Sequence, residues 1–277
     1  MSKCQKLEKE ECIKDKDCIF TNGNKRKYCR TKKNKKTQTS PKKTTPKKTT
    51  PKKMTPKKMT PKKTTPKKTS PEEDTSPIVY VASMNMRGKW AVAPDGCKKI
   101  NVTSSQASKS KYRLAFSPMT PIQGGYKGFY CFENYWQQGK RYEGITDIDK
   151  QLEWWKNQKK GKRRYPLGKN KKIMHAVYPG FDKPLDYITS RKLVYVPEYY
   201  KLISNNQVLH DLKKEANNKC LVVYDFDGPR KNDKSPSIEK VTLNLLKEKL
   251  NDPRFPFGHG YIVAASILGY TPSDYIS

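Results

Sequence analysis

The chain lacks any long apolar stretch. No run of apolar residues approaches the roughly twenty that a membrane-spanning helix needs, so we expect no membrane span. The first residues, Met-Ser-Lys-Cys-Gln-Lys, contain no hydrophobic segment like that of a secretory leader. We therefore expect the protein in the cytoplasm or nucleus of a host cell, or in a particle assembled there, such as a virion.

Histidine is scarce, and His175, His210 and His259 lie far apart with no metal-binding spacing. His259 stands between two glycines before an apolar segment, where we expect a structural residue bonded to the backbone. We expect no cofactor in this part of the chain.

Acidic residues are heavily outnumbered, with 26 Asp and Glu against 59 Lys and Arg, which gives a net charge of +33. Residues 1–77 hold 25 basic and 8 acidic residues, and residues 78–277 hold 34 and 18. Both parts are therefore strongly basic. We expect phosphate-rich partners, attracted over long range by forces that salt weakens.

Residues 41–68 repeat Pro-Lys-Lys six times at five-residue spacing. Proline removes amide donors and disfavours helix in the preceding residue, and almost nothing apolar is available to bury. We expect a disordered linker over residues 32–77. It either binds nucleic acid or another polyanion, or acts as a charged spacer. The polyanion-binding candidates are Lys42, Lys43, Lys47, Lys48, Lys52, Lys53, Lys57, Lys58, Lys62, Lys63, Lys67 and Lys68.

Four cysteines, Cys4, Cys12, Cys18 and Cys29, lie within residues 1–31. A segment too short to form a core needs a staple, either two disulfides or one zinc ion. The absence of a Cys-x2-Cys knuckle favours disulfides slightly. Residues 18–29 are predicted to form a hairpin. This segment resembles short Cys modules at the ends of proteins of large DNA viruses.

Residues 78–277 are predicted to form one α+β domain, mainly helical with a small sheet. The predicted strands are 78–82, 89–93 and 219–225, and residues 96–113 are predicted to be irregular. The predicted helices are 129–142, 147–160, 195–203, 207–216, one that begins at Ser235 and Pro236, and 260–268.

The densest aromatic segment, residues 129–140, contains a single carboxylate, Glu133, together with Gln137 and Lys140. A carboxylate among aromatic rings loses hydration, which raises its pKa and suits it to acid–base or glycosidic chemistry. The alternative is a core helix that leaves Glu133 and Gln137 at the surface.

Phe116-Ser117-Pro118 is followed by Gly128-Phe-Tyr-Cys-Phe-Glu133 and then by Gln137-Gln-Gly-Lys140. This order resembles the opening of the NADAR family, in which a loop precedes a helix carrying a motif glutamate, a glutamine and a lysine. Segments 187–199 and 224–229 resemble an uncharacterised family of bacteria and large DNA viruses, interpreted as a distant NADAR relative. The resemblance covers residues 112–270.

The resemblance implies an N-glycosidase that hydrolyses a C1′–N bond of an ADP-ribose or nucleotide-type ligand through an oxocarbenium-like state. Glu133 matches the family's motif glutamate, and Asp225 or Asp227 its later acid. The implied ligand-binding residues are Trp136, Gln137, Lys140, Trp154, Trp155, Arg191 and Lys192, with either Trp154 or Trp155 as the stacking tryptophan. The chain departs from the family at Asn134, where histidine is usual, and at residues 257–260.

Two further interpretations come from the residues themselves. Asp225-Phe-Asp227-Gly228 after an apolar strand is similar to a haloacid-dehalogenase nucleophile motif, but only fifty residues follow it, without that family's acidic metal-binding pair. A basic stretch, residues 156–172, is either a phosphate-binding loop or a solvated surface loop. For the whole chain, the alternative to an enzyme is a DNA-associated or virion structural protein.

Overall fold

The computed structural model describes residues 4, 8–22, 27–31, 77–86 and 88–277. The chain divides into two compact units, Met1–Lys68 and Thr69–Ser277. The Pro-Lys-Lys repeats and their lysines lie outside the described residues, so their predicted disorder and polyanion binding stay predictions. None of the helices in the described ranges has the length and apolar character needed to cross a bilayer.

The small unit is a helix packed on a hairpin. Helix α1 (Lys9–Lys14) precedes strands β1 (Cys18–Asn22) and β2 (Lys27–Thr31), which pair antiparallel as predicted. Disulfides join Cys4 to Cys18 and Cys12 to Cys29, and all four cysteines are buried. No group of His, Cys, Asp or Glu in the described residues is arranged to hold a metal ion. Disulfides therefore form the staple where the sequence left zinc as the alternative.

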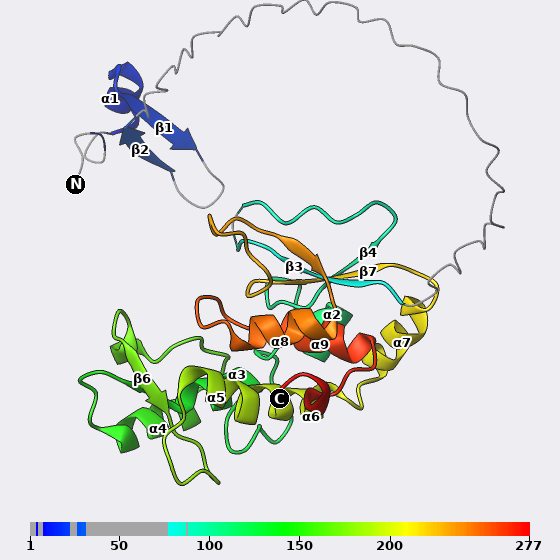
Figure 1. Cartoon of the computed structure of the whole chain (residues 1–277). Helices are drawn as coiled ribbons and strands as arrows, with labels where there is room; N and C mark the ends of the chain where they lie inside the picture. Colours follow the sequence, from blue (N-terminus) through cyan, green and yellow to red (C-terminus); the bar gives the residue numbers. More distant parts are fainter. Residues whose placement is uncertain (1–3, 5–7, 23–26, 32–76, 87) are drawn as a thin grey trace, which may run out of the picture. The chain divides into compact units, whose positions relative to one another are not determined.

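The larger unit has a four-stranded mixed sheet in the order β4-β7-β3-β8 (Figure 1). Strands β4 (Lys98–Asn101) and β3 (Val79–Ser83) both run parallel to the central strand β7 (Leu221–Asp225). Strand β8 (Ile238–Lys240) pairs antiparallel with β3. With helices around this sheet, the predicted α+β class is confirmed.

Alternation along the strands explains why both faces of the sheet are covered. Val81 and Val223 are paired in register and belong to the main core. Ala82 and Tyr224, the next pair, point to the other face and pack with Ala91 from the loop after β3. Nearly continuous apolar character in β7 is typical of a parallel strand buried on both sides.

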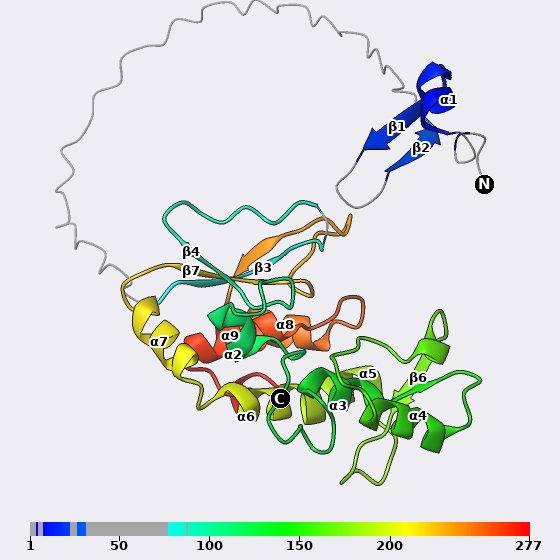
Figure 2. The same ribbon diagram turned by 180° about the vertical axis from the view of Figure 1, so that it is seen from behind.

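Helices cover the main core face in two layers. In Figures 1 and 2, α8 and α9 lie between the sheet and a second layer that contains α3, α5 and α6. A separate two-stranded antiparallel sheet of β5 (Lys140–Tyr142) and β6 (Ile173–Ala176) extends from this second layer. The helices are α2 (Lys111–Phe116), α3 (Phe132–Gln138), α4 (Ile148–Lys156), α5 (Tyr187–Ser190), the π-helical turn Arg191–Tyr195, α6 (Val196–Ile203), α7 (Gln207–Ala216), α8 (Leu243–Asn251) and α9 (His259–Ile267), with short 3-10 turns at Pro166–Gly168 and Pro272–Asp274.

Four local predictions are wrong. The helix predicted over residues 129–142 is limited to Phe132–Gln138, and residues 140–142 form β5. Residues 89–93 form a loop that makes only an isolated bridge, between Met84 and Trp90, because they cover the sheet face instead of extending it. Residues 98–101, predicted to be irregular, form β4. The helix predicted from Ser235 begins instead at Leu243, where Thr242 accepts a hydrogen bond from the Leu245 amide. The segment before it contains β8, which completes the sheet.

A third disulfide, unforeseen from the sequence, joins Cys97 to Cys220. These residues precede β4 and β7, so the bridge ties two neighbouring parallel strands together where both begin. The link closes a separation of 123 residues. Cross-linking so distant positions restricts the unfolded chain strongly.

Replacing Cys97 and Cys220 together with serine should lower the free energy of unfolding of the larger unit by about 2–4 kcal/mol, because the unfolded chain regains the freedom that the bridge removes. All four tryptophans of the chain lie between residues 90 and 155, so tryptophan fluorescence during urea unfolding follows this unit alone. Cys131, buried and free, serves as the control as Cys131→Ala. An unchanged urea midpoint in the double variant would contradict a stabilising disulfide.

Candidate active site

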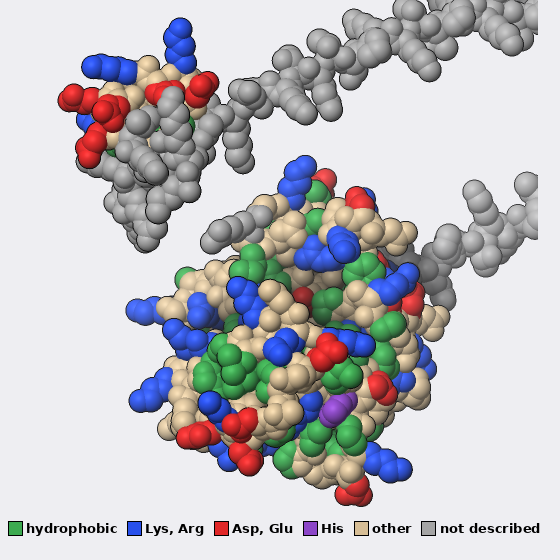
Figure 3. Space-filling model, turned by 90° about the vertical axis from the view of Figure 1, so that its left-hand side faces the viewer, with side chains coloured by type: hydrophobic (Ala, Val, Ile, Leu, Met, Phe, Trp, Pro, Cys, Tyr) green, Lys and Arg blue, Asp and Glu red, His purple; other side chains and the backbone are tan. Residues whose placement is uncertain are grey.

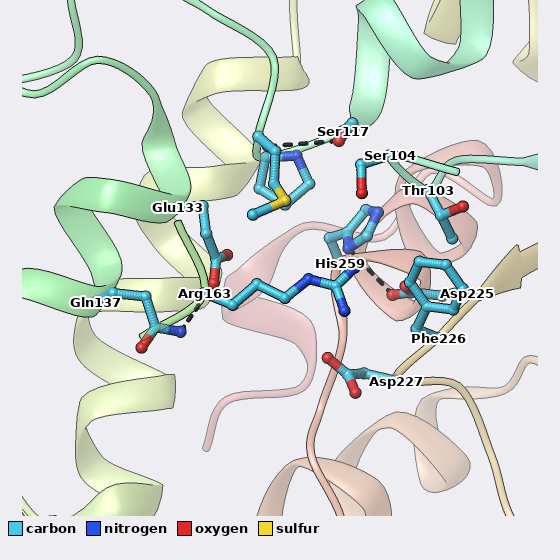
Figure 4. A pocket seen from close by; sticks show the side chains of 12 residues that line it. Thr103, Ser104, Ser117, Glu133, Gln137, Arg163, Asp225, Phe226, Asp227 and His259 are labelled. Atoms are coloured by element: carbon cyan, nitrogen blue, oxygen red, sulfur yellow. Dashed lines mark hydrogen bonds and ion pairs between the residues drawn. The ribbon is translucent and has the colours of Figure 1, made fainter. Parts of the chain in front are cut away.

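The parallel strands bring polar residues together where they end. Residues after β4 and β7, the start of α3 and the start of α9 enclose a cavity of about 250 Å³ (Figure 4). A cavity outside the carboxyl ends of parallel strands is the usual place for a ligand in such sheets. Its lining residues are Thr103, Ser104, Ser117, Pro118, Met119, Glu133, Gln137, Arg163, Asp225, Phe226, Asp227 and His259.

Helix α3 presents Glu133 to this cavity. Phe132, Tyr135 and Trp136 of the helix are buried in the aromatic core, which leaves the Glu133 and Gln137 face directed at the cavity. The Gln137 amide donates a hydrogen bond of 2.8 Å to Glu133 Oε1. The backbone N–H of Glu133 donates to Pro118 O at 2.8 Å, which fixes the first turn of the helix.

Asp225 is a buried anchor for the start of α9. Its Oδ2 accepts a hydrogen bond from the Gly260 amide at 2.8 Å and lies 3.1 Å from His259 Nδ1. The other ring nitrogen, Nε2, donates to the Val102 carbonyl at 3.0 Å, since a carbonyl can only accept. His259 is thus bonded to the backbone, as the sequence suggests, and it also faces the cavity. Asp225, buried and bonded to both Gly260 and His259, is not an accessible nucleophile. This counts against the haloacid-dehalogenase interpretation.

Of the two aspartates that follow each other closely here, Asp225 and Asp227, Asp227 is the one that faces the cavity. The turn after β7 directs its carboxylate into the cavity opposite Glu133 (Figure 4). Gly258 packs directly on this turn: a Cβ added there would lie 2.7 Å from Asp227 Cβ. Only glycine allows the start of α9 to approach the end of β7 so closely. The sequence treated Asp225 and Asp227 as equivalent acids, whereas the structure separates their roles.

Both accessible carboxyl groups bind protons more readily than usual. Burial raises the pKa of Glu133, against the opposing effects of the Lys140 charge and the Gln137 hydrogen bond. Burial, followed by the charge of Asp225, raises the pKa of Asp227 to about 6, although solvent reaches Asp227 through the cavity. Carboxyl groups with pKa values near neutrality are suited to proton transfer.

Arg163 enters the cavity from the basic stretch between α4 and β6. Its guanidinium lies 5.1 Å from the centre of the Phe226 ring, and in Figure 4 the side chain extends across the space between Glu133 and His259. Asn134, which is fully buried, positions this segment: its amide donates to Lys160 O and its oxygen accepts from the Lys162 amide. The asparagine that departs from the NADAR pattern therefore holds the loop that carries Arg163.

No ion pair joins the basic stretch, residues 156–172, to a carboxylate of the described residues. Figure 3 shows lysine and arginine side chains spread over one face of the larger unit, around a hollow. Most of the cations in the stretch are exposed. It therefore offers unneutralised positive charge beside the cavity.

Several predicted ligand-binding residues line a smaller cavity of about 110 Å³. Trp136, Lys140 and Arg191 lie there, and Glu133, Gln137 and Asp227 are shared with the first cavity. Arg191 also has a structural role, because its guanidinium donates to the Leu250 carbonyl in the last turn of α8 and to the Asp252 and Phe255 carbonyls beyond it.

Trp154, Trp155 and Lys192 lie outside both of these cavities. Trp155 is fully buried in the main core, and Trp154 packs edge-on against it with ring centres 4.8 Å apart. The helical spacing of α4 turns Trp155 inward, so neither tryptophan is placed to stack on a ligand. The aromatic wall comes from Trp136 instead.

Arg163, Thr103, Ser104 and Ser117 line the cavity but were not predicted as site residues, although Ser117 belongs to the Phe116-Ser117-Pro118 motif. Arg163 belongs to a recognisable basic stretch, but nothing in that pattern distinguishes the one side chain that reaches the cavity. Thr103 and Ser104 follow a strand that was predicted to be irregular. Had β4 been recognised as a parallel neighbour of β7, Thr103 and Ser104 would have been predicted to lie beside Asp225 and Asp227.

Comparison with protein-family models, with curated proteins and with solved structures finds no match for this chain. The resemblance to the NADAR family therefore stays an interpretation of the sequence motifs, and the cavity must be read from its own geometry.

Asp227 should titrate near pH 6, and Asp225→Asn should lower its pKa because that substitution removes a neighbouring negative charge. The folded pKa lies above the unfolded value of about 3.9. The contribution of Asp227 to the free energy of unfolding is therefore fully present below the unfolded pKa, where Asp227 is protonated. This contribution is lost as the pH rises through about 6. Carboxyl carbon NMR titration measures both effects. A titration of Asp227 near pH 4 in the wild type would contradict the expected burial of its carboxylate.

Proposed function

We propose that residues 78–277 bind and hydrolyse an N-glycoside of the nucleotide or ADP-ribose type. One observation carries the proposal: Glu133 and Asp227, distant in sequence, face a single cavity that is also lined by the cation Arg163. Two carboxyl groups flanking a glycosidic bond are the usual catalytic set for stabilising and trapping an oxocarbenium-like state. The motif resemblance of Glu133 to the NADAR glutamate supports the same reaction.

In this mechanism, water adds to C1′ while the C1′–N bond breaks and its electron pair leaves with the nitrogen. Glu133 accepts the proton of the attacking water, and its negative charge stabilises the developing cation. Asp227, with a pKa of about 6, donates a proton to the leaving nitrogen. The net change is one water consumed, with a free sugar hydroxyl and a protonated base released.

His259 and Arg163 act on the electrostatics of these two groups. Both residues act to lower the pKa of Glu133 and of Asp227, against the larger effect of burial. His259 is rigidly placed by Asp225 and Val102, whereas Arg163 comes from a loop and rests on the Phe226 ring. We assign the first a fixed positioning role and the second a contact with an anionic part of the ligand.

Glu133→Gln should reduce hydrolysis of ADP-ribosylated guanosine by about 10²–10⁴-fold, because the amide cannot accept a proton. The released ADP-ribose is measured by chromatography. The matched control is Glu153→Gln, because Glu153 is an exposed glutamate on α4 that does not line the cavity. This variant should retain full activity. Circular dichroism verifies that both variants are folded. Absence of turnover in the wild type, or turnover indifferent to Glu133→Gln, refutes the proposed reaction.

We infer that the Pro-Lys-Lys repeats tether this domain to a polyanion such as nucleic acid. The support is compositional: twelve lysines occupy residues 41–68 in a regular pattern without a single acidic residue. Charge of this kind contributes affinity but carries no sequence information. The repeats would then determine where the domain is located, and the cavity would determine which ligand it binds.

Deleting residues 36–70 should flatten the dependence of DNA binding on salt, because each lysine–phosphate contact adds about 0.9 to the logarithmic slope. Fluorescence anisotropy over a salt series measures the slope. A variant with the twelve lysines replaced by glutamine keeps the proline spacing and length, and should match the deletion. An unchanged slope in both would leave the repeats as a spacer and assign DNA binding to other cations of the chain.

A further inference from the structure

Another cavity lies on the far side of α3 from Glu133. Helices α3 and α4, strand β5 and the segment after β6 enclose a hollow of about 560 Å³, which shares no lining residue with the two cavities of the candidate active site. Tyr135 and Gln138, three residues apart on α3, line this hollow, whereas Glu133 and Gln137 line the other side. In Figures 1 and 2, α3, α4 and β6 lie away from the four-stranded sheet. We call this hollow the side cavity.

The buried wall of the side cavity is aromatic. Phe129, Tyr135 and Tyr178 form it, and the centre of the Tyr135 ring lies 6.1 Å from that of Phe129 and 5.8 Å from that of Tyr178. Tyr178 is fixed from behind, because it stacks on Trp136 and donates a hydrogen bond to the Trp136 carbonyl. Leu152 of α4 adds an aliphatic wall. The size and the lining suit a small organic molecule with a flat apolar body.

Arg141 of β5 brings a guanidinium with one unpartnered edge to this cavity. Its Nη1 donates to the three carbonyls of residues 138–140, at 2.7, 3.0 and 3.3 Å, which locks the side chain against the carboxyl end of α3. Its Nε and Nη2 donate to no group of the described residues, and no carboxylate among them forms an ion pair with Arg141. These two N–H groups point the same way, which is the arrangement that binds both oxygens of a carboxylate.

The Gln138 side chain is a second polar group without a partner. Gln138 is only 5% exposed, and its side-chain amide makes no hydrogen bond to the described residues. Neither polar atom of this amide is fully enclosed, so the amide reaches open space, which the side cavity provides. A buried amide without a partner costs free energy, which a hydrogen bond to a ligand oxygen would recover.

Two lysines line the side cavity as well. Lys127 is neutralised by Glu198, whose Oε2 lies 2.6 Å from its Nζ. Lys156, exposed in the last turn of α4, has no ion-pair partner in the described part of the chain. No Asp or Glu of the described residues lines this cavity. Arg141 and Lys156 therefore leave a positive charge that an anionic ligand would compensate.

We propose that the side cavity binds an aromatic carboxylate, with its ring against Tyr135 and Tyr178 and its carboxylate on the Nε and Nη2 edge of Arg141. The Gln138 amide donates to the same carboxylate, and Lys156 attracts the anion at the entrance. A carboxylate attached to a ring satisfies both the guanidinium edge and the apolar walls, whereas free phosphate would leave those walls unfilled. The site is separate from the proposed hydrolysis, because none of its residues lines the candidate active site.

The test uses indole-3-acetate as the probe, indole-3-acetamide as its uncharged counterpart, and calorimetric titration of the full chain. Wild type should bind indole-3-acetate, and should bind the amide at least about tenfold more weakly, because the amide lacks the charge-assisted contact with Arg141. Acetate and inorganic phosphate should give no measurable heat of binding, because neither fills the apolar part of the cavity.

Variants locate the bound probe. Arg141→Lys keeps the charge but loses the planar edge, and should weaken the binding of indole-3-acetate by about fivefold or more. Lys156→Glu reverses a charge at the exposed entrance, and should weaken the binding of indole-3-acetate by about threefold while that of the amide stays the same. Lys150→Glu is the matched control, because Lys150 is exposed on the same helix but does not line the cavity. It should leave both affinities unchanged.

The side-cavity site is overturned if indole-3-acetate does not bind, or if the amide binds equally well. Equal losses in Lys156→Glu and Lys150→Glu also overturn it, because they would assign the effect to the overall charge of the protein. If Arg141→Lys proves unstable, the comparison of the two lysine variants decides. None of these measurements depends on hydrolysis, so failure of the side-cavity site and failure of the proposed reaction are distinguishable.

Discussion

The contact between Asp225 and the first turn of α9 is the constraint on which the larger unit depends. A carboxylate that is almost fully buried must be compensated, and the Gly260 amide and His259 ring provide that compensation. The contact joins the last residue of the central strand to the start of the most buried helix. Gly258 and Gly260 make it sterically feasible, because a side chain at either position would collide with Asp225 or Asp227. One polar contact therefore closes the core and shapes the cavity beside it.

An aromatic scaffold holds the opposite wall. Trp136 stacks on Tyr178 with ring centres 5.7 Å apart, and the Tyr178 hydroxyl donates to the Trp136 carbonyl. Phe132 lies against Tyr199, whose hydroxyl donates to the Phe116 carbonyl. Because rings of this size pack with restricted geometry, α3 has little freedom to turn Glu133 away from the cavity. Glu133 on α3 and Asp227 after β7 are thus held in fixed positions before any ligand binds. Such preorganised groups can stabilise a transition state more than a ground state.

The sequence predicted those features that depend on local patterns. Helix α7, with Asn206 accepting from the Val208 amide at its start, and the apolar strand β7 were both recognised, as was the Cys-bearing hairpin. Glu133 was selected because it matches the motif glutamate of the NADAR resemblance, within an aromatic segment that contains a single carboxylate. The parallel pairing of β4 with β7 escaped prediction, because a four-residue strand with two lysines has no distinctive alternation and gains its strand conformation only from its neighbour.

The sequence alone determined the α+β class, the strong positive charge, the need of the small unit for a staple, and a short set of candidate acids. Only the tertiary structure decided how those residues divide their tasks. It buried Asp225 and directed Asp227 into the cavity, turned Trp155 into the core while Trp136 reached a cavity, and bonded Arg191 to the Asp252 carbonyl beyond the end of α8. The reason is physical: hydration, charge proximity and steric contact depend on what lies opposite a side chain in space, and sequence spacing does not specify that across 100 residues of intervening chain.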